Sequence, residues 1–216
     1  MKTFGILFMV VACICIAAYG QVEEGVSQPT AFQFDQDRLM NRLADLKPFK
    51  SEKGEFEQER SSFLVTQDDF RNSLVLLIKE QEKVDEIMAH FSNAAAFSFK
   101  KGTQLLTLMQ WTDSESAQEF MKLRYELWRL TDKEYQQYIR KVVYEEIDLT
   151  KNEKALLTRK TIQQSKQKQD VTTFISARDK YLFECTLIGD YRKSDVKKLI
   201  LQIWKIIDSE EKKGVH

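Results

Sequence analysis

The chain contains few of the residues from which common catalytic and metal sites are built. Its 216 residues include two histidines, His90 and His216, and three cysteines. Zinc sites usually need three or four nitrogen, sulfur or carboxylate ligands, and no segment here carries two histidines at helical i, i+4 spacing. We therefore expect no histidine-based zinc site and no cofactor in this protein.

Glycine is scarce as well. None of the seven glycines lies in a G-x-S-x-G pattern, which many serine hydrolases use to expose the nucleophile. The glycine-rich patterns that cradle phosphate groups, G-x-G-x-x-G and G-x-x-x-x-G-K-[ST], are missing too. These absences disfavour serine hydrolysis and nucleotide-dependent catalysis.

The positions of the three cysteines exclude a disulfide within residues 21–216. Cys13 and Cys15 lie within the first twenty residues, so Cys185 is the one cysteine that remains. Strand alternation places Cys185 on the same face as Phe183 and Leu187, an apolar setting that favours the protonated thiol. We expect a buried, inert side chain rather than a nucleophile.

The charge balance limits the class of partner. The sequence has 33 basic and 33 acidic residues, with 43% hydrophobic residues and two prolines. A neutral chain of this composition is expected to fold, and it lacks the basic excess of a nucleic-acid-binding protein. We expect no nucleic-acid partner.

The first twenty residues have the three parts of a secretory signal peptide. Lys2 precedes an apolar run from Phe4 to Ala18, and small residues stand ahead of Gln21. This predicts cleavage near Gly20, a secreted or periplasmic protein without a transmembrane span, and a flexible leader over residues 21–34. Two alternatives remain open, a lipoprotein lipidated at Cys13 and an uncleaved membrane anchor.

Hydrophobic periodicity predicts the elements of the rest of the chain. Helices are expected over 35–46 and 81–91, from residue 113, from residue 131 and from residue 195. Strands are expected over 63–66, 74–78, 96–100, 104–111, 142–149, 171–177 and 181–188, with hairpins at Gly102 and at Asp179. Capping-box spacings at Thr112 and Thr131, and Ser194, mark three of the helix starts.

The element order over residues 74–149 predicts an α+β protein with a ferredoxin-like order, in which an antiparallel sheet carries helices on one face. Residues 35–149 form one unit, and residues 150–216 form a second hairpin-helix unit packed with it as one domain. Shifting the second hairpin by 77 positions aligns Phe174 with Phe97 and Leu182 with Leu105. The alternatives are a duplicated hairpin-helix unit and two unrelated hairpins.

Two segments are candidate binding sites. Residues 151–170 have a net charge of +4 and could bind an anionic surface such as a phospholipid headgroup, an acidic glycan or an acidic protein; the alternative is a solvated hairpin. Its basic residues are Lys151, Lys154, Arg159, Lys160, Lys166 and Lys168. The candidate pocket residues are four tyrosines that cluster around a predicted helix break: Tyr125, Tyr135, Tyr138 and Tyr144.

The sequence thus favours an exported, non-catalytic binding or envelope-interaction protein of unknown ligand. One alternative is a small cofactor-dependent oxidoreductase or haem-handling protein of the dimeric α/β-barrel kind, in which His90 would be the available histidine ligand. Another is a structural or assembly factor that presents its sheet face or edge to a second chain.

Overall fold

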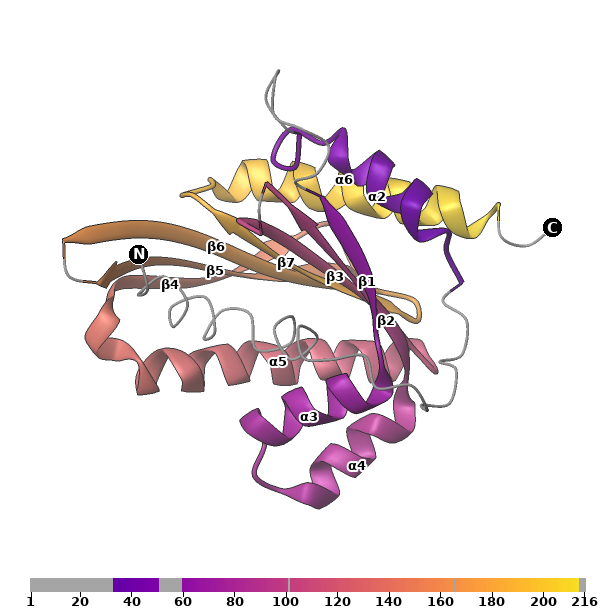
Figure 1. Cartoon of the computed structure of the whole chain (residues 1–216), viewed down its shortest axis with the longest axis horizontal. Helices are drawn as coiled ribbons and strands as arrows, with labels where there is room; N and C mark the ends of the chain where they lie inside the picture. Colours follow the sequence, from indigo (N-terminus) through magenta and orange to yellow (C-terminus); the bar gives the residue numbers. More distant parts are fainter. Residues whose placement is uncertain (1–32, 51–59, 101, 165, 214–216) are drawn as a thin grey trace.

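The computed structural model describes residues 33–50, 60–100, 102–164 and 166–213 (Figure 1). The predicted signal peptide, and the predicted leader up to residue 32, lie outside these residues. Within the described part of the chain, no helix has both the length and the apolar character needed to cross a membrane.

The described residues form five α-helices, one short 3-10 helix and seven strands. The α-helices are α2 (Gln36–Ala44), α3 (Gln67–Leu77), α4 (Gln81–His90), α5 (Ser114–Glu134) and α6 (Lys193–Glu211), and the 3-10 helix is η3 (Gln136–Tyr138). The strands are β1 (Ser61–Val65), β2 (Phe91–Phe99), β3 (Gln104–Trp111), β4 (Ile139–Asp148), β5 (Lys154–Gln164), β6 (Gln167–Arg178) and β7 (Tyr181–Ile188).

The strands make one open antiparallel sheet in the order β1-β2-β3-β7-β6-β5-β4. The fold is therefore α+β with an antiparallel sheet, as predicted. Both predicted hairpins, β2–β3 and β6–β7, are confirmed. Their turns contain residues with positive φ, Gly102 at 80° and Asp179 at 49°. The two hairpins join through β3 and β7, where Leu108 lies opposite Phe183.

Helices cover both faces of this sheet, so the prediction of helices on one face is wrong. Figure 1 shows α2 and α6 on one side and α3, α4 and α5 on the other. The strands explain why two layers are needed. In β2, Phe97 packs in the core beneath α6, whereas its neighbour Ala96 packs in the core beneath α5. Every residue of β7 from Tyr181 to Leu187 is buried, so each face of the sheet requires its own cover.

The ferredoxin-like order over residues 74–149 is also wrong, for two reasons. The apolar run 74–78 continues helix α3, which begins at a capping box formed by Thr66 and Asp69. A run of five apolar residues cannot by itself distinguish a strand from a buried helix segment. In addition, β4 lies at the far end of the sheet and is separated from β3 by β7, β6 and β5.

A duplication of the hairpin-helix unit does not fit the arrangement of the helices. The two hairpins meet at the antiparallel pair β3 and β7, so a two-fold rotation about an axis perpendicular to the sheet would exchange them. Such a rotation does not exchange the two faces of the sheet. A true copy would therefore place both following helices on one face. Instead, Trp128 of α5 packs in one core and Trp204 of α6 in the other.

The structure differs from the prediction at three helix starts. Asp113, rather than Thr112, caps α5 by accepting a hydrogen bond from the backbone amide of Ser116 at 2.8 Å. No second helix begins at Thr131, because α5 continues to Glu134 and η3 follows. Ser194 lies inside α6, whose N-cap is Arg192.

Candidate functional site

The basic segment does not form a single patch. Lys154 pairs with Glu146 at 2.9 Å and Arg159 with Glu145 at 2.6 Å. Lys160 is largely buried and pairs with Asp132 of α5 at 2.5 Å. These three cations are thus engaged by carboxylates of the same molecule, which leaves them little capacity for an external anion.

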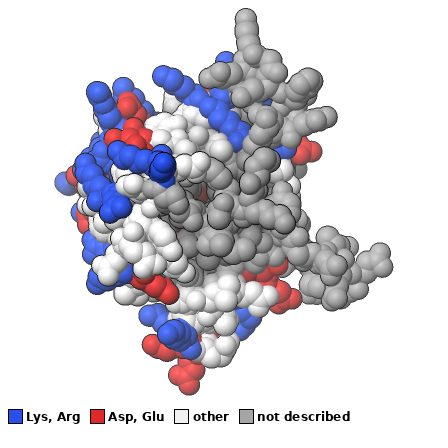
Figure 2. Space-filling model, turned by 60° about the vertical axis from the view of Figure 1, so that its left-hand side comes forward, with Lys and Arg blue, Asp and Glu red and all other residues white. Residues whose placement is uncertain are grey.

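The remaining three lysines lie at opposite ends of the β5–β6 hairpin. Lys151 is in the turn before β5, whereas Lys166 and Lys168 are at or beside the turn after it; all three are exposed, and none makes an ion pair within the described residues. Figure 2 brings forward the left-hand side of Figure 1, which carries the β5–β6 turn, and shows Lys and Arg side chains with Asp and Glu among them. The geometry fits the alternative interpretation of this segment, a solvated hairpin.

Two of the four candidate tyrosines meet, and two do not. The rings of Tyr125 and Tyr144 are perpendicular with centroids 5.9 Å apart, and the guanidinium of Arg129 lies over both rings at 4.8 and 5.1 Å. Tyr135 is half-buried beside η3 and Tyr138 is exposed, and no ring contact joins either to the first pair within the described residues. The helix break therefore does not gather the four into a pocket.

The Tyr144 hydroxyl belongs to a compact polar network. It donates to Asp132 at 2.7 Å, and Lys160 donates to the other oxygen of that carboxylate. Burial, and then the hydrogen bond to Asp132, raise the pKa of Tyr144 well above its ordinary value. Because these groups satisfy one another, the network serves to attach the end of α5 to β4 and β5.

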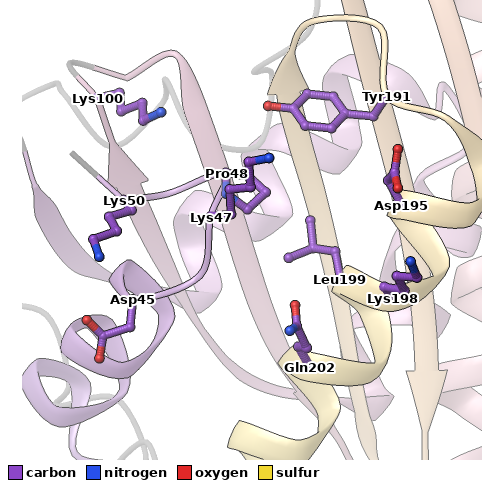
Figure 3. Close-up of a pocket in the computed structure, with 10 residues that line it drawn as sticks. All are labelled: Asp45, Lys47, Pro48, Lys50, Lys100, Tyr191, Asp195, Lys198, Leu199 and Gln202. Carbon is purple, nitrogen blue, oxygen red and sulfur yellow. The ribbon is translucent and has the colours of Figure 1, made fainter. Parts of the chain in front are cut away.

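A cavity of about 970 Å³ lies elsewhere, at one end of the sheet on the α6 side (Figure 3). Its walls come from three segments: the loop after α2, the β2–β3 turn, and α6 with the segment that leads into it. The residues that line it are Asp45, Lys47, Pro48, Lys50, Lys100, Tyr191, Asp195, Lys198, Leu199 and Gln202.

Lysine dominates the charge of this cavity. Lys47 and Lys50 come from the loop after α2, Lys100 from the hairpin and Lys198 from α6. Against these four cations stand two carboxylates, Asp45 and Asp195, so the lining has a net positive charge. A lining with net positive charge favours an anionic occupant.

The α6 wall is built by helical periodicity. Asp195, Lys198, Leu199 and Gln202 follow one another at i, i+3, i+4 and i+7, which places them on one side of the helix. Figure 3 shows the Leu199 side chain pointing into the space between α6 and the loop after α2. Leu199 also belongs to the core, together with Ile203 and Trp204 on the adjoining side of α6.

Tyr191 forms the upper rim of the cavity, and its hydroxyl is turned toward the side from which Lys100 enters (Figure 3). Burial, and to a lesser extent the nearby Cys185, raise the pKa of Tyr191, so the phenol remains a hydrogen-bond donor at neutral pH. Gly189 permits this placement. Its φ is +132°, and an added Cβ would lie 3.0 Å from the Tyr191 ring.

The loop after α2 is held to the sheet by one ring contact and is closed on itself by two backbone hydrogen bonds. Phe49 is fully buried and its ring stacks on Phe99 with centroids 4.7 Å apart. The backbone amides of Phe49 and Lys50 both donate to the carbonyl of Leu46 at 2.9 Å. The wall that carries Lys47 and Lys50 is therefore held by the core.

Helix α2, which leads into that loop, is tied to α6 through one carboxylate. Glu210 is 2% exposed and accepts hydrogen bonds or ion pairs from Arg38, Arg42 and Lys213. Burial opposes its ionisation, but the hydrogen bonds from these three cations outweigh burial and hold the pKa of Glu210 below its ordinary value. We call Glu210 with Arg38, Arg42 and Lys213 the α2–α6 clamp.

Cys185 and His90, the described cysteine and histidine, are not among the residues that line the cavity. Cys185 is fully buried, as predicted, and burial followed by the charge of Glu184 raises the pKa of its thiol. His90 is half-exposed on the α5 side, with Nδ1 3.2 Å from the Thr112 hydroxyl. Among the described residues, no group of three His, Cys, Asp or Glu side chains is placed to hold a metal ion.

Sequence reasoning missed the cavity because its lysines come from segments far apart in the chain. No local charge run or motif includes Lys47, Lys100 and Lys198 together, and only the packing of α6 and the β2–β3 turn brings them to one place. The helical spacing of residues 195–202 was a visible signal, but it indicates an amphipathic helix rather than a site.

Comparisons with known proteins do not assign this chain to a family. Neither the protein-family models nor the curated proteins contain a match to this chain. Inference about function therefore depends on the geometry described above.

Proposed function

We propose that this protein is an exported, non-catalytic binding protein, and that its ligand is a small organic anion held in the cavity between α6 and the loop after α2. The observation that carries the proposal is a cavity of about 970 Å³ whose lining includes four lysines from three separate segments. Sites for small molecules typically have volumes of roughly 300–1,000 Å³, so this cavity is of a suitable size.

The lining also suggests the chemistry of the ligand. Lysine amines are mobile point charges and suit a carboxylate, sulfonate or phosphate group. Leu199, Pro48 and the ring of Tyr191 offer apolar contact beside these charges, and the Tyr191 hydroxyl can donate to an oxygen. A ligand with one anionic group attached to a small apolar body would use both parts of the lining.

Binding is favoured over catalysis by the residue types at the cavity. Among the described residues that line it there is no histidine or cysteine. Haem ligation through His90 would take place on the opposite side of the sheet, because α4 and the cavity lie on different faces. The oxidoreductase alternative has no comparable support from the site geometry.

The test is a fluorescence titration with anilinonaphthalene sulfonate, whose sulfonate and aromatic body match the proposed ligand chemistry. The double variant Lys47→Gln/Lys198→Gln removes two amines from the cavity. Each exposed charge pair contributes up to about 1 kcal/mol, so the dissociation constant should rise about tenfold. The affinity of the unchanged protein should also fall with added salt.

A matched control removes two exposed lysines from the other side of the molecule. Lys79→Gln/Lys83→Gln makes the same change in net charge near α4, away from the cavity. It should leave the dissociation constant unchanged. Equal weakening by both double variants would show that the probe responds to overall charge, and would contradict the proposed site.

Export is supported by the pattern of the first twenty residues, and it has a separate test. The intact mass of material secreted by expressing cells should correspond to a chain that begins at Gln21. A mass that includes residues 1–20, or a lipid attached at Cys13, would replace this part of the proposal.

A further inference from the structure

Strand β4 forms one end of the described sheet. It spans ten residues, Ile139–Asp148, and within the described part of the chain it pairs with β5 alone. The outer edge of such a strand presents backbone donors and acceptors that can pair with another strand.

We propose that two copies of this chain associate through β4. The two strands would pair antiparallel about a two-fold axis at Val143, so that the sheets of both copies become one continuous sheet. This proposal rests on the sequence and exposure of β4, and it is independent of the cavity.

The two-fold axis restricts the possible registers. Paired residues in an antiparallel sheet point to the same face, and a two-fold axis perpendicular to the sheet keeps each face in place. Each residue can therefore lie opposite only a residue whose side chain is on the same face of β4, which means a residue an even number of positions away, or the same residue of the second copy. In every allowed register, one residue at the centre lies opposite the same residue of the second copy.

The register centred on Val143 matches every neighbouring pair by chemical type. Val143 meets Val143 of the second copy, Val142 meets Tyr144, and Lys141 meets Glu145. Two-fold symmetry makes the last two contacts occur twice. Opposite charges and apolar side chains placed directly across from one another are the pairs that stabilise a sheet.

The neighbouring registers lack this match. A register centred on Val142 places Lys141 opposite Val143, and a register centred on Tyr144 places Glu145 opposite Val143. Each of these leaves a charge facing an apolar side chain. Self-association at β4 is thus selective for a single register.

The side chains of the proposed interface are accessible. Lys141 is exposed and makes no ion pair within the described residues, and Val142 and Val143 are half-buried. Glu145 contacts Arg159 of its own chain at 2.6 Å, but its side chain is 24% exposed and has remaining acceptor capacity. The one irregularity in the β4–β5 register lies between Ile139 and Lys141, outside the five central pairs.

Sedimentation equilibrium of the purified protein tests the proposal. The unchanged chain should form a dimer as its concentration rises. Lys141→Glu replaces two attractive contacts with two repulsive ones, and should raise the dimer dissociation constant about tenfold or more. Lys151→Glu, with the same charge change in the β4–β5 turn, should leave dimerisation unaffected.

A mixing experiment separates pairing from misfolding. Lys141→Glu and Glu145→Lys should each dimerise about tenfold more weakly alone, because like charges then face each other, yet an equimolar mixture should form heterodimers with an affinity near that of the wild type. Circular dichroism would check that each variant is folded. A monomeric wild type over the accessible concentration range, or a Lys141→Glu variant that dimerises like the wild type, would overturn the proposal.

Discussion

The α2–α6 clamp should contribute measurably to the free energy of unfolding. Glu210→Gln keeps the size and one acceptor oxygen of the side chain but removes its charge. Charged hydrogen bonds contribute roughly 1.5–3 kcal/mol each, and the side chains of Arg38 and Arg42 are 44% and 34% exposed, which weakens the interaction. We therefore expect the variant to lose about 2 kcal/mol in urea unfolding.

The pH dependence of this loss has a definite sign. The folded-state pKa of Glu210 lies below its ordinary value of 4.5, because the hydrogen bonds from Arg42, Arg38 and Lys213 outweigh the opposing effect of burial. The ionised carboxylate therefore stabilises the fold fully above the unfolded-state pKa, and this contribution is lost as the pH falls through the folded-state pKa. The difference between wild type and Glu210→Gln should be constant near neutrality and shrink at acidic pH.

A matched control uses an exposed carboxylate. Glu126→Gln removes the partner of Arg129 on the surface of α5, where the two side chains are 60% and 44% exposed, and it should unfold at the same urea concentration as the wild type. Equal stability of Glu210→Gln and wild type at neutral pH would refute the reasoning. So would a difference between them that grows as the pH is lowered.

Two further substitutions test other parts of the structure. Arg124 donates to Glu184 at 2.7 and 3.0 Å within the core, so Glu184→Ala should cost about 3–5 kcal/mol in urea unfolding, and Arg124→Leu/Glu184→Leu should recover part of that loss. A double variant as unstable as the single one would count against this account. Gly189→Ala should lower thermal stability by about 1–3 kcal/mol and weaken probe binding, since the added Cβ must displace Tyr191. Unchanged melting and binding would show that Tyr191 is not held by this glycine.

Local patterns predicted the individual elements better than their arrangement. The hairpin at Gly102 follows from a short polar link with a glycine between two apolar runs, and α6 follows from the helical spacing of its buried residues. The prediction of a strand over 74–78 is wrong because every residue of this run is apolar, so the sequence does not show which of them are buried. In the structure the run belongs to a helix with one buried side: Leu74 is fully buried, whereas Leu76 is 75% exposed.

The layering of the helices depends on which strands become neighbours. Insertion of β7 beside β3, and of β6 and β5 beyond it, buries both faces of the central strands, and no local pattern specifies those pairings. The same long-range packing brings Lys47, Lys100 and Lys198 to one cavity. Buried Cys185, by contrast, was predictable because strand alternation alone determines its apolar setting.

The position of a bound anion is the most direct test of the proposed function. Amide resonances of the protein can be followed by heteronuclear nuclear magnetic resonance while anilinonaphthalene sulfonate is added. The largest shifts should occur in residues 45–50, at Lys100 and in residues 191–202, which surround the cavity. Shifts that concentrate on α3 and α4, or on the β5–β6 turn, with the cavity residues unchanged, would contradict a ligand site between α6 and the loop after α2.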